Sequence, residues 1–121
     1  MNKELAKVEN VFFGIEDHGI LTFIIYLDYG GSSQGFGNIG LSYHDRERDM
    51  WLDEKGAGMT MIYNILGFFG VRQFEHIKGK TVFAIKDERD NVIGLERTKF
   101  DGGAKFMLDD WRKKFWPEKY K

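Results

Sequence analysis

The segment ILTFIIYLDYGGSSQGFGNIG, residues 20–40, decides how the rest of this chain is organised. Its first eight residues are apolar on both faces of an extended chain, which predicts a central β-strand covered on each side. Residues 28–40 then contain five glycines, two serines, two amides and, after Tyr29 at the strand end, one exposed-looking ring, Phe36. Glycine at this density permits positive φ and close approach of another molecule to the main chain. We interpret residues 28–40 as a ligand-contacting loop with Phe36 exposed, the alternative being a bulged hairpin in which Phe36 packs into the core.

Length and composition favour one domain spanning residues 1–121. The 18 Lys and Arg residues nearly balance the 19 Asp and Glu residues, and a net charge of −1 makes nucleic acid an improbable partner. The absence of cysteine excludes disulfides, thiolate metal sites and cysteine nucleophiles. The polar start, Met1–Glu4, has no signal-like run, and no apolar stretch reaches transmembrane length, so we expect an intracellular protein without a membrane partner.

The remaining N-terminal half reads as strands and a charged connection. Residues 5–15 become β-like, and the turn Asp17-His18-Gly19 predicts a hairpin with the central strand. A third strand is expected over Ile39–Tyr43. Residues 44–55 are highly charged and are interpreted as a solvated connection in which Met50-Trp51-Leu52 packs inward.

The segment GAGMTMIYNILGFFG, residues 56–70, is predicted to form the main helix. One apolar stripe at helical spacing is expected to face the core, namely Met59, Ile62, Tyr63, Leu66 and Phe69. A second stripe lies nearly opposite, formed by Met61, Ile65 and Phe68. Because a helix that is apolar nearly all round must be buried nearly all round, we expect the second stripe to lie at the interface of a homo-oligomer, a dimer or larger. The alternative is that the C-terminal segment covers it.

The C-terminal half predicts a second hairpin and a second helix. A short helical turn is expected around Phe74–Ile77, and two β-like runs, residues 80–86 and 92–99, are joined by a turn at Asp90-Asn91. Residues 105–115 have helical periodicity, with Pro117 marking the end. The predicted fold class is α+β: an antiparallel sheet, one main central helix at an oligomer interface, a second β-hairpin and a C-terminal helix.

No catalytic or metal-binding constellation emerges from the sequence. His18, His44 and His76 are far apart and lack ligand spacing. Ser32 and Ser33 lack the context of a hydrolase nucleophile, and the glycines match neither a dinucleotide fingerprint nor a phosphate-binding loop. The sequence therefore predicts a non-enzymatic protein with no metal and no cofactor.

What remains is a set of residues suited to a small phosphorylated nucleotide. A ring would stack on the base, side-chain amides would read the base edge or ribose hydroxyls, and backbone amides of the glycine loop or helix start would hold phosphate. Arginines would neutralise the charge. The predicted ligand-binding residues are Ser32, Ser33, Gln34, Phe36, Asn38, Gly58, Met59, Thr60, Arg97 and Arg112.

The runs FGIEDHGILT at residues 13–22 and LDYGGSSQGFG at residues 27–37 resemble a family of small phage proteins, the first described type of Thoeris anti-defence sponge. The resemblance covers roughly the first two-thirds of the chain. It implies a non-enzymatic oligomer in the host bacterial cytoplasm that binds a cyclic ADP-ribose isomer, made by TIR-domain defence proteins, at subunit junctions. Some members also bind cyclic trinucleotides. The chain departs from the family at Asp53-Glu54-Lys55, where relatives carry arginines before the helix.

Two other functions are considered. One is a phage nucleic-acid accessory protein or host-protein inhibitor that acts by protein contacts. The other is an enzyme that cleaves the cyclic nucleotide, which the lack of an acid–base or metal set disfavours.

Overall fold

The computed structural model describes residues 2–53, 56–99 and 102–115, and the predicted helix end at Pro117 lies outside them. The fold is α+β, as predicted. Within these residues six antiparallel strands form one sheet in the order β3-β2-β1-β6-β7-β8. The strands are β1 (Asn2–Ile15), β2 (Leu21–Asp28), β3 (Ser33–Gly37), β6 (Thr81–Lys86), β7 (Val92–Arg97) and β8 (Lys105–Met107).

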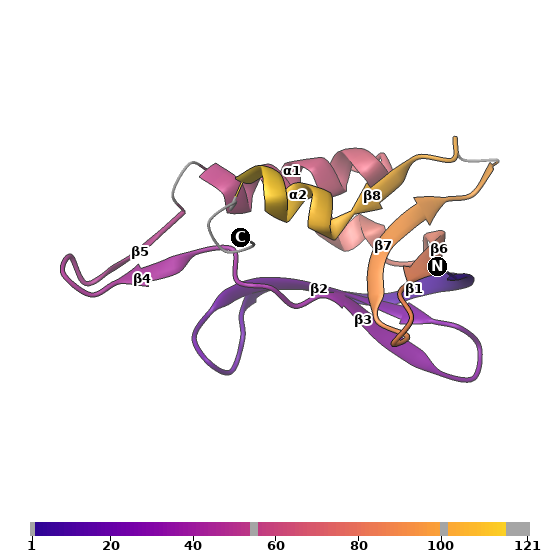
Figure 1. Ribbon diagram of the computed structural model, residues 1–121, viewed down its shortest axis with the longest axis horizontal. Helices are drawn as coiled ribbons and strands as arrows, with labels where there is room; N and C mark the ends of the chain where they lie inside the picture. Colours follow the sequence, from indigo (N-terminus) through magenta and orange to yellow (C-terminus); the bar gives the residue numbers. More distant parts are fainter. Residues whose placement is uncertain (1, 54–55, 100–101, 116–121) are drawn as a thin grey trace.

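Both helices lie on one side of this sheet (Figure 1). The main helix α1 (Ala57–Phe69) is flanked by Gly56 and Gly70, which both adopt left-handed φ, at 66° and 69°. Glycine alone enters this conformation without steric cost, which explains why the helix ends where the sequence predicted. A 3₁₀ turn, η2 (Phe74–Ile77), also lies where it was predicted. The last helix, α2 (Leu108–Phe115), begins three residues later than expected because residues 105–107 pair with β7.

The core lies between the sheet and α1. The alternate residues Phe23, Ile25 and Leu27 of β2 supply fully buried side chains, and Thr22 is buried beside them. The strand is central, as predicted, but its outward residues Ile24 and Tyr26 are only half-buried, so the second face of β2 is less covered than its apolar sequence suggested.

The prediction that Phe36 is exposed is wrong. Phe36 has 0 % exposed surface, and its ring contacts those of Phe23 and Phe106 edge-on, with centroids 6.2 Å apart in each pair. The ring belongs to β3, which pairs with β2. The third strand is therefore residues 33–37 rather than Ile39–Tyr43, and the hairpin alternative is correct.

The predicted faces of α1 are wrong in part, because only Ile62 and Phe69 of the expected core stripe are buried as predicted. Met61, Ile65 and Phe68, expected at a subunit interface, are buried in the chain's own core, where Phe68 packs on Phe106 of β8. Conversely, Met59 and Tyr63, expected in the core, are 60 % and 81 % exposed. The C-terminal segment contacts this second stripe at Phe68, through Phe106 of β8.

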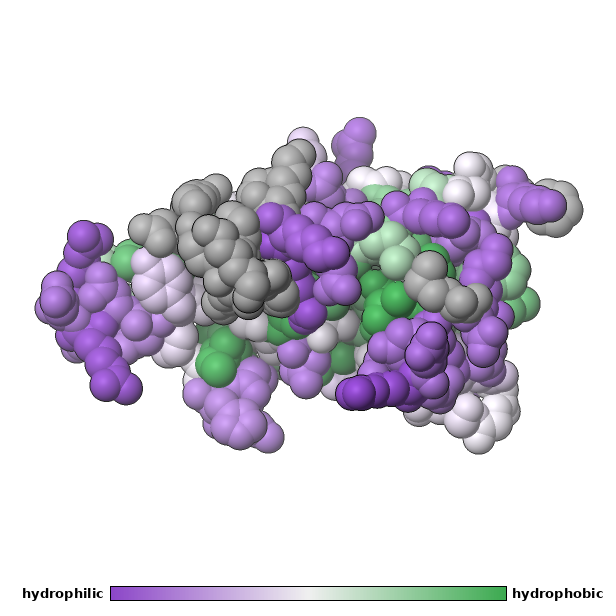
Figure 2. Space-filling model, viewed as in Figure 1, coloured by the Kyte–Doolittle hydropathy of each residue, from purple (hydrophilic) through white to green (hydrophobic). Residues whose placement is uncertain are grey.

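A two-stranded hairpin, formed by β4 (Tyr43–Asp45) and β5 (Met50–Leu52), replaces the predicted connection. Figure 1 shows this β4–β5 arm extending beyond the sheet, and Figure 2 shows its surface as mostly hydrophilic. Met50 and Trp51 are about half exposed rather than packed inward. The Trp51 ring instead stacks on His44 of the facing strand, with centroids 5.2 Å apart.

Candidate functional site

The turn between β2 and β3 is an exposed glycine turn, as the sequence suggested. The Asp28 carboxylate accepts a hydrogen bond from the Gly30 amide at 2.9 Å, and the Tyr29 amide donates to the Ser32 carbonyl at 2.9 Å. Gly30 has a φ of 103°, which favours glycine. Ser32 and Ser33 are exposed beside it, so their hydroxyl groups face solvent at the edge of the sheet.

The predicted ligand residue Gln34 is already engaged within the protein. Its Oε1 accepts a hydrogen bond from the Tyr29 hydroxyl at 2.7 Å, and its Nε2 donates to the backbone carbonyl of Asp90 at 2.7 Å. These bonds join the β2–β3 hairpin to the β6–β7 turn. Gln34 therefore positions these two turns, and its amide would have to exchange both bonds to read a nucleotide.

Lys86 completes this polar cluster. Only 6 % exposed, its ammonium lies 2.8 Å from the Glu4 carboxylate, 3.3 Å from Asp90 and 4.2 Å from the centroid of the Tyr29 ring. The hydrogen bond with Glu4 raises the pKa of Lys86, while burial raises the pKa of the Tyr29 hydroxyl. The charge is compensated on several sides, so the cluster is a structural connection between strands.

The predicted phosphate contacts at the start of α1 are occupied. The two carboxylate oxygens of Asp53 accept hydrogen bonds from the amides of Gly58 and Met59, at 2.7 and 3.0 Å. A carboxylate at a helix N-terminus is favourable by itself. A phosphate would have to displace Asp53 to reach the amides of Gly58 and Met59.

A hollow with a volume of about 660 Å³ lies between α1, β8 and α2. We call it the α1–β8 groove, and among its lining residues are Thr60, Tyr63, Asn64, Phe68, Lys105 and Phe106. Phe68 and Phe106 pack edge-on at 6.2 Å and form an aromatic wall. Thr60, Asn64 and Lys105 add a hydroxyl, an amide and an ammonium group.

Three predicted ligand residues belong to this region. Thr60 lines the groove, and the backbone amide of Arg97 donates at 2.7 Å to the carbonyl of Ala104, another lining residue. Arg112 lies on α2, two residues after the lining residue Asp110, and its guanidinium is 3.8 Å from Asp109. Both arginine side chains are half-buried. The remaining predicted residues lie elsewhere, so the structure does not bring the whole predicted set together.

Asn38 lines a separate hollow of about 310 Å³ on the outer face of the sheet. Its backbone has a φ of 55°. Phe12 and Tyr26 also line this hollow, and the β1–β2 turn borders it with Glu16 and His18. The Glu16 carboxylate contacts His18 Nδ1 at 2.8 Å, which raises the pKa of His18 and lowers the pKa of Glu16. The same carboxylate accepts hydrogen bonds from the amides of His18 and Ile20, so its main role is to close the turn.

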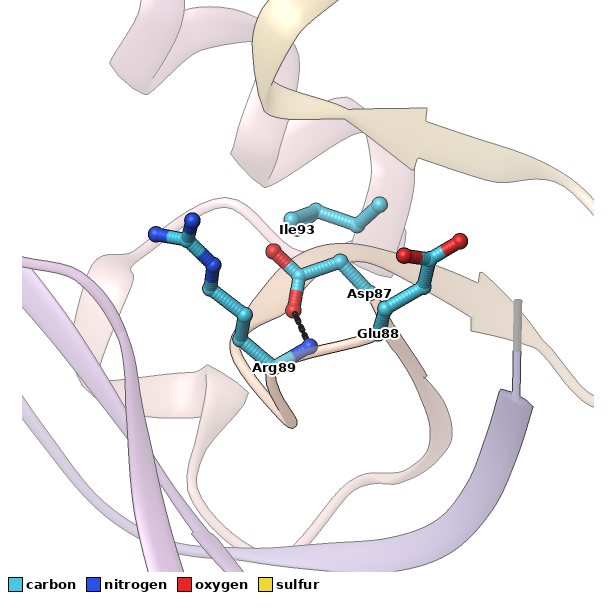
Figure 3. Close-up of a pocket in the computed structure, with 4 residues that line it drawn as sticks. All are labelled: Asp87, Glu88, Arg89 and Ile93. Atoms are coloured by element: carbon cyan, nitrogen blue, oxygen red, sulfur yellow. Dashed lines mark hydrogen bonds between the residues drawn. The ribbon is translucent and has the colours of Figure 1, made fainter.

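A further hollow, about 320 Å³, is formed by the β6–β7 turn (Figure 3). Asp87 Oδ1 accepts hydrogen bonds from the amides of Arg89 and Asn91, at 2.9 Å each, and chiefly the bond with Asn91 lowers the pKa of Asp87. Figure 3 shows the Arg89 guanidinium directed away from the Asp87 carboxylate. This arrangement closes a turn and does not gather groups around a ligand.

Sequence reasoning missed Asn64, Lys105 and Phe106 as groove residues. Asn64 could have been predicted from the sequence, because an amide among apolar helix residues indicates a position on the solvent-facing side of the helix. The position of Lys105 was hidden, since residues 105–107 were assigned to a helix rather than to β8.

Among residues 2–53, 56–99 and 102–115, no group of three or more His, Asp or Glu side chains is placed to hold a metal ion. No helix in those same ranges is long and apolar enough to cross a membrane. In comparisons with known proteins, no family model, no curated protein and no solved structure matches this chain.

Proposed function

We propose that this protein binds a cyclic nucleotide immune signal, a cyclic ADP-ribose isomer or a related cyclic nucleotide, and sequesters it without degrading it. It would act as a homo-oligomer in the cytoplasm of a bacterial host during phage infection. The resemblance of residues 13–22 and 27–37 to the anti-defence sponge family suggests this class of ligand.

The observation that carries the proposal is the α1–β8 groove. Its volume of about 660 Å³ lies within the range of small-molecule pockets, roughly 300–1,000 Å³. The half-buried ring of Phe106, which packs edge-on against the buried Phe68, suits a purine base, since aromatic stacking accepts any base face. The Thr60 hydroxyl and the Oδ1 atom of Asn64, whose Nδ2 already donates to the Thr60 carbonyl at 2.7 Å, suit ribose hydroxyls, and the ammonium group of Lys105 suits a phosphate.

The ion pair of Lys105 leaves part of its charge uncompensated, although the Asp110 carboxylate also lines the groove. Lys105 lies 3.5 Å from Glu96, but Lys3 also binds this carboxylate, at 2.9 Å. Two ammonium groups therefore share one carboxylate, and the hydrogen bond with Lys3 is the main cause that lowers the pKa of Glu96. The cluster keeps one net positive charge at neutral pH, beside the groove.

The test is a titration of the purified chain with cyclic ADP-ribose isomers from a TIR-domain enzyme, followed by calorimetry. Free signal should fall in proportion to the number of sites and then stop falling. Heating the complex should return a molecule of unchanged mass that still activates its effector. Turnover beyond one ligand per site, or a linearised product, would identify an enzyme instead.

Two variants connect this binding to the groove. Lys105→Ala should weaken binding roughly 10-fold or more, because a hydrogen bond to a charged group contributes about 1.5–3 kcal/mol. Asn64→Ala should weaken it less. Lys113→Ala, an exposed lysine of α2 that does not line the groove, is the matched control and should bind like the wild type.

A second candidate function, inhibition of a host protein by direct contact, is favoured by the β4–β5 arm. Met50 and Trp51 are about half exposed on an arm that extends from the sheet. Exposed aromatic and methionine side chains are enriched in protein interfaces. A stoichiometric complex with a host protein that is lost in Trp51→Ala, without nucleotide binding, would select this function.

A further inference from the structure

The outer face of α1 is an unusual solvent-exposed surface. Residues 56–71 contain no charged side chain, although 31 % of the chain is charged. The exposed positions of the helix include Met59, Tyr63, Asn64 and Gly67. A helix face in permanent contact with water normally carries charged residues, whereas interface centres lack charge and are enriched in Tyr and Met.

A protruding ring and a hollow lie side by side on this face. Tyr63 is 81 % exposed. A hollow of about 360 Å³, which we call the Gly67 hollow, is lined by Tyr63, Leu66, Gly67, Val71 and Arg72. A Cβ atom on Gly67 would meet nothing within 4 Å, so the space above this glycine is open. Tyr63 and Gly67 are four residues apart and therefore adjacent on the helix surface.

We propose that α1 packs antiparallel against α1 of a second copy of this chain, with Tyr63 of each copy entering the Gly67 hollow of the other. A two-fold axis requires one surface patch to fit itself, and a ring beside a hollow on a single face meets this condition. The pairing of position 63 with position 67 places Met59 against Val71 of the second copy. Both contacts occur twice.

The charges at the two ends of α1 fit the same register. Asp53 caps the amides of Gly58 and Met59, and Arg72 lies exposed three residues beyond the helix. Antiparallel packing in this register places Arg72 opposite Gly58 of the second copy, and hence beside its Asp53. Two pairs of opposite charge then border an uncharged centre. A lipid surface fits less well, because interfacial helices carry Lys or Arg around their apolar face.

This pairing specifies a contact surface for the homo-oligomer proposed above, and it does not require a bound nucleotide. The surface adjoins the α1–β8 groove, because Tyr63 and Gly67 line both hollows. The prediction from sequence that Met61 and Ile65 form the interface is replaced, since both are buried within one chain.

Sedimentation equilibrium of the ligand-free full chain between about 1 and 200 μM tests the pairing. The wild type should show the mass of two chains or an even multiple, and Tyr63→Ala should raise the dissociation constant at least tenfold. Gly67→Arg should abolish this contact, while its circular dichroism stays native because the site is open in one copy. Trp51→Ala, an exposed ring on the β4–β5 arm, should leave association unchanged.

The absence of native cysteine allows a direct test of register. Differently tagged Tyr63→Cys and Gly67→Cys chains, mixed and mildly oxidised, should form the 63–67 disulfide faster than either variant crosslinks with itself. A wild type that is monomeric throughout, or an assembly that Gly67→Arg does not change, overturns the proposal. A monomer that binds nucleotide refutes this pairing alone, and a paired protein that binds no nucleotide refutes only the proposed function.

Discussion

The Nζ atom of Lys86 lies 4.2 Å from the centroid of the Tyr29 ring, and the hydroxyl group of that ring donates to Gln34. The cation and the ring connect the first half of the sheet to the second. Glu4 of β1 and Asp90 of the β6–β7 turn complete the contact with Lys86. The sheet edge at the glycine turn is thus held by charge as well as by its backbone hydrogen bonds.

Removal of this ammonium group should destabilise the fold. We expect Lys86→Ala to lower the melting temperature, because two carboxylates and the Tyr29 ring lose their shared cation. Lys86→Met should recover part of the loss, since its side chain fills much of the same space. Lys78→Ala, an exposed lysine, is the control. Equal melting temperatures for Lys86→Ala and this control would contradict a stabilising role.

Truncation of Phe36 should destabilise the fold, because the ring is a core residue and not a ligand contact. Phe36→Ala should lower the free energy of unfolding by about 3–5 kcal/mol, the cost typical of removing a buried aromatic ring. Phe36→Leu should cost less because it leaves a smaller cavity. Urea denaturation measures both. A fully stable Phe36→Ala variant would show that the ring contributes nothing to the core.

Two glycines of α1 should respond to alanine in opposite directions. At Gly58 a Cβ atom would lie 2.2 Å from the Leu41 carbonyl oxygen, so Gly58→Ala forces the helix away and should cost about 1–3 kcal/mol. At Gly67 the space is open, so Gly67→Ala should stabilise the helix by about 0.5–1 kcal/mol. Thermal denaturation at a concentration where the chain is monomeric compares the two. Similar changes at both positions would contradict the close approach at Gly58.

The Glu16–His18 pair should titrate as a unit. The hydrogen bond from Glu16 raises the pKa of His18 above its usual value of about 6.5 and lowers the pKa of Glu16. The contribution of His18 to stability is therefore complete below about pH 6.5 and is lost as the pH rises through its folded pKa. The contribution of Glu16 is complete above about pH 4.3 and is lost as the pH falls through its folded pKa.

An NMR titration of the His18 ring measures this directly. Glu16→Gln should return the pKa of His18 toward its usual value, whereas Asp17→Asn, which removes the neighbouring carboxylate, should change it less. A larger effect from Asp17→Asn than from Glu16→Gln would show that Glu16 is not the main cause of the raised pKa of His18.

The helix ends were predictable from sequence, but the buried face of α1 was not. Gly56 and Gly70 are required by the left-handed φ at each end, so composition alone located them. Both stripes of the helix are apolar, and hydrophobic periodicity cannot choose between them. The choice depends on Gly58, which faces Leu41 and permits close packing there. Only the tertiary fold shows that contact.

The β3 strand was hidden by its glycines. Its inward positions are Gln34 and Phe36, the outward position Gly35 has no side chain, and at Gly37 a Cβ atom would meet the buried Phe23 ring. The alternation of a strand is therefore present, although it looks like a flexible loop. The predicted ligand residues do not form one site. Side chains such as Gln34 and Asp53 can bind ligands in other proteins, but here they bind the protein's own backbone.

The long strand β1 has a consequence for how the chain folds. Its second half pairs with the adjacent β2, whereas its first half pairs with β6, joining Asn2 to Lys86 and Lys7 to Thr81, with a bulge between Val8 and Asn10. The β1–β2 and β6–β7 hairpins form from segments that are neighbours in the sequence. The pairing between β1 and β6, in contrast, must close a loop of more than seventy residues. Such non-local pairing is slow, so we expect it to set the folding rate. During synthesis, the first half of β1 waits for its partner until residues 81–86 have left the ribosome.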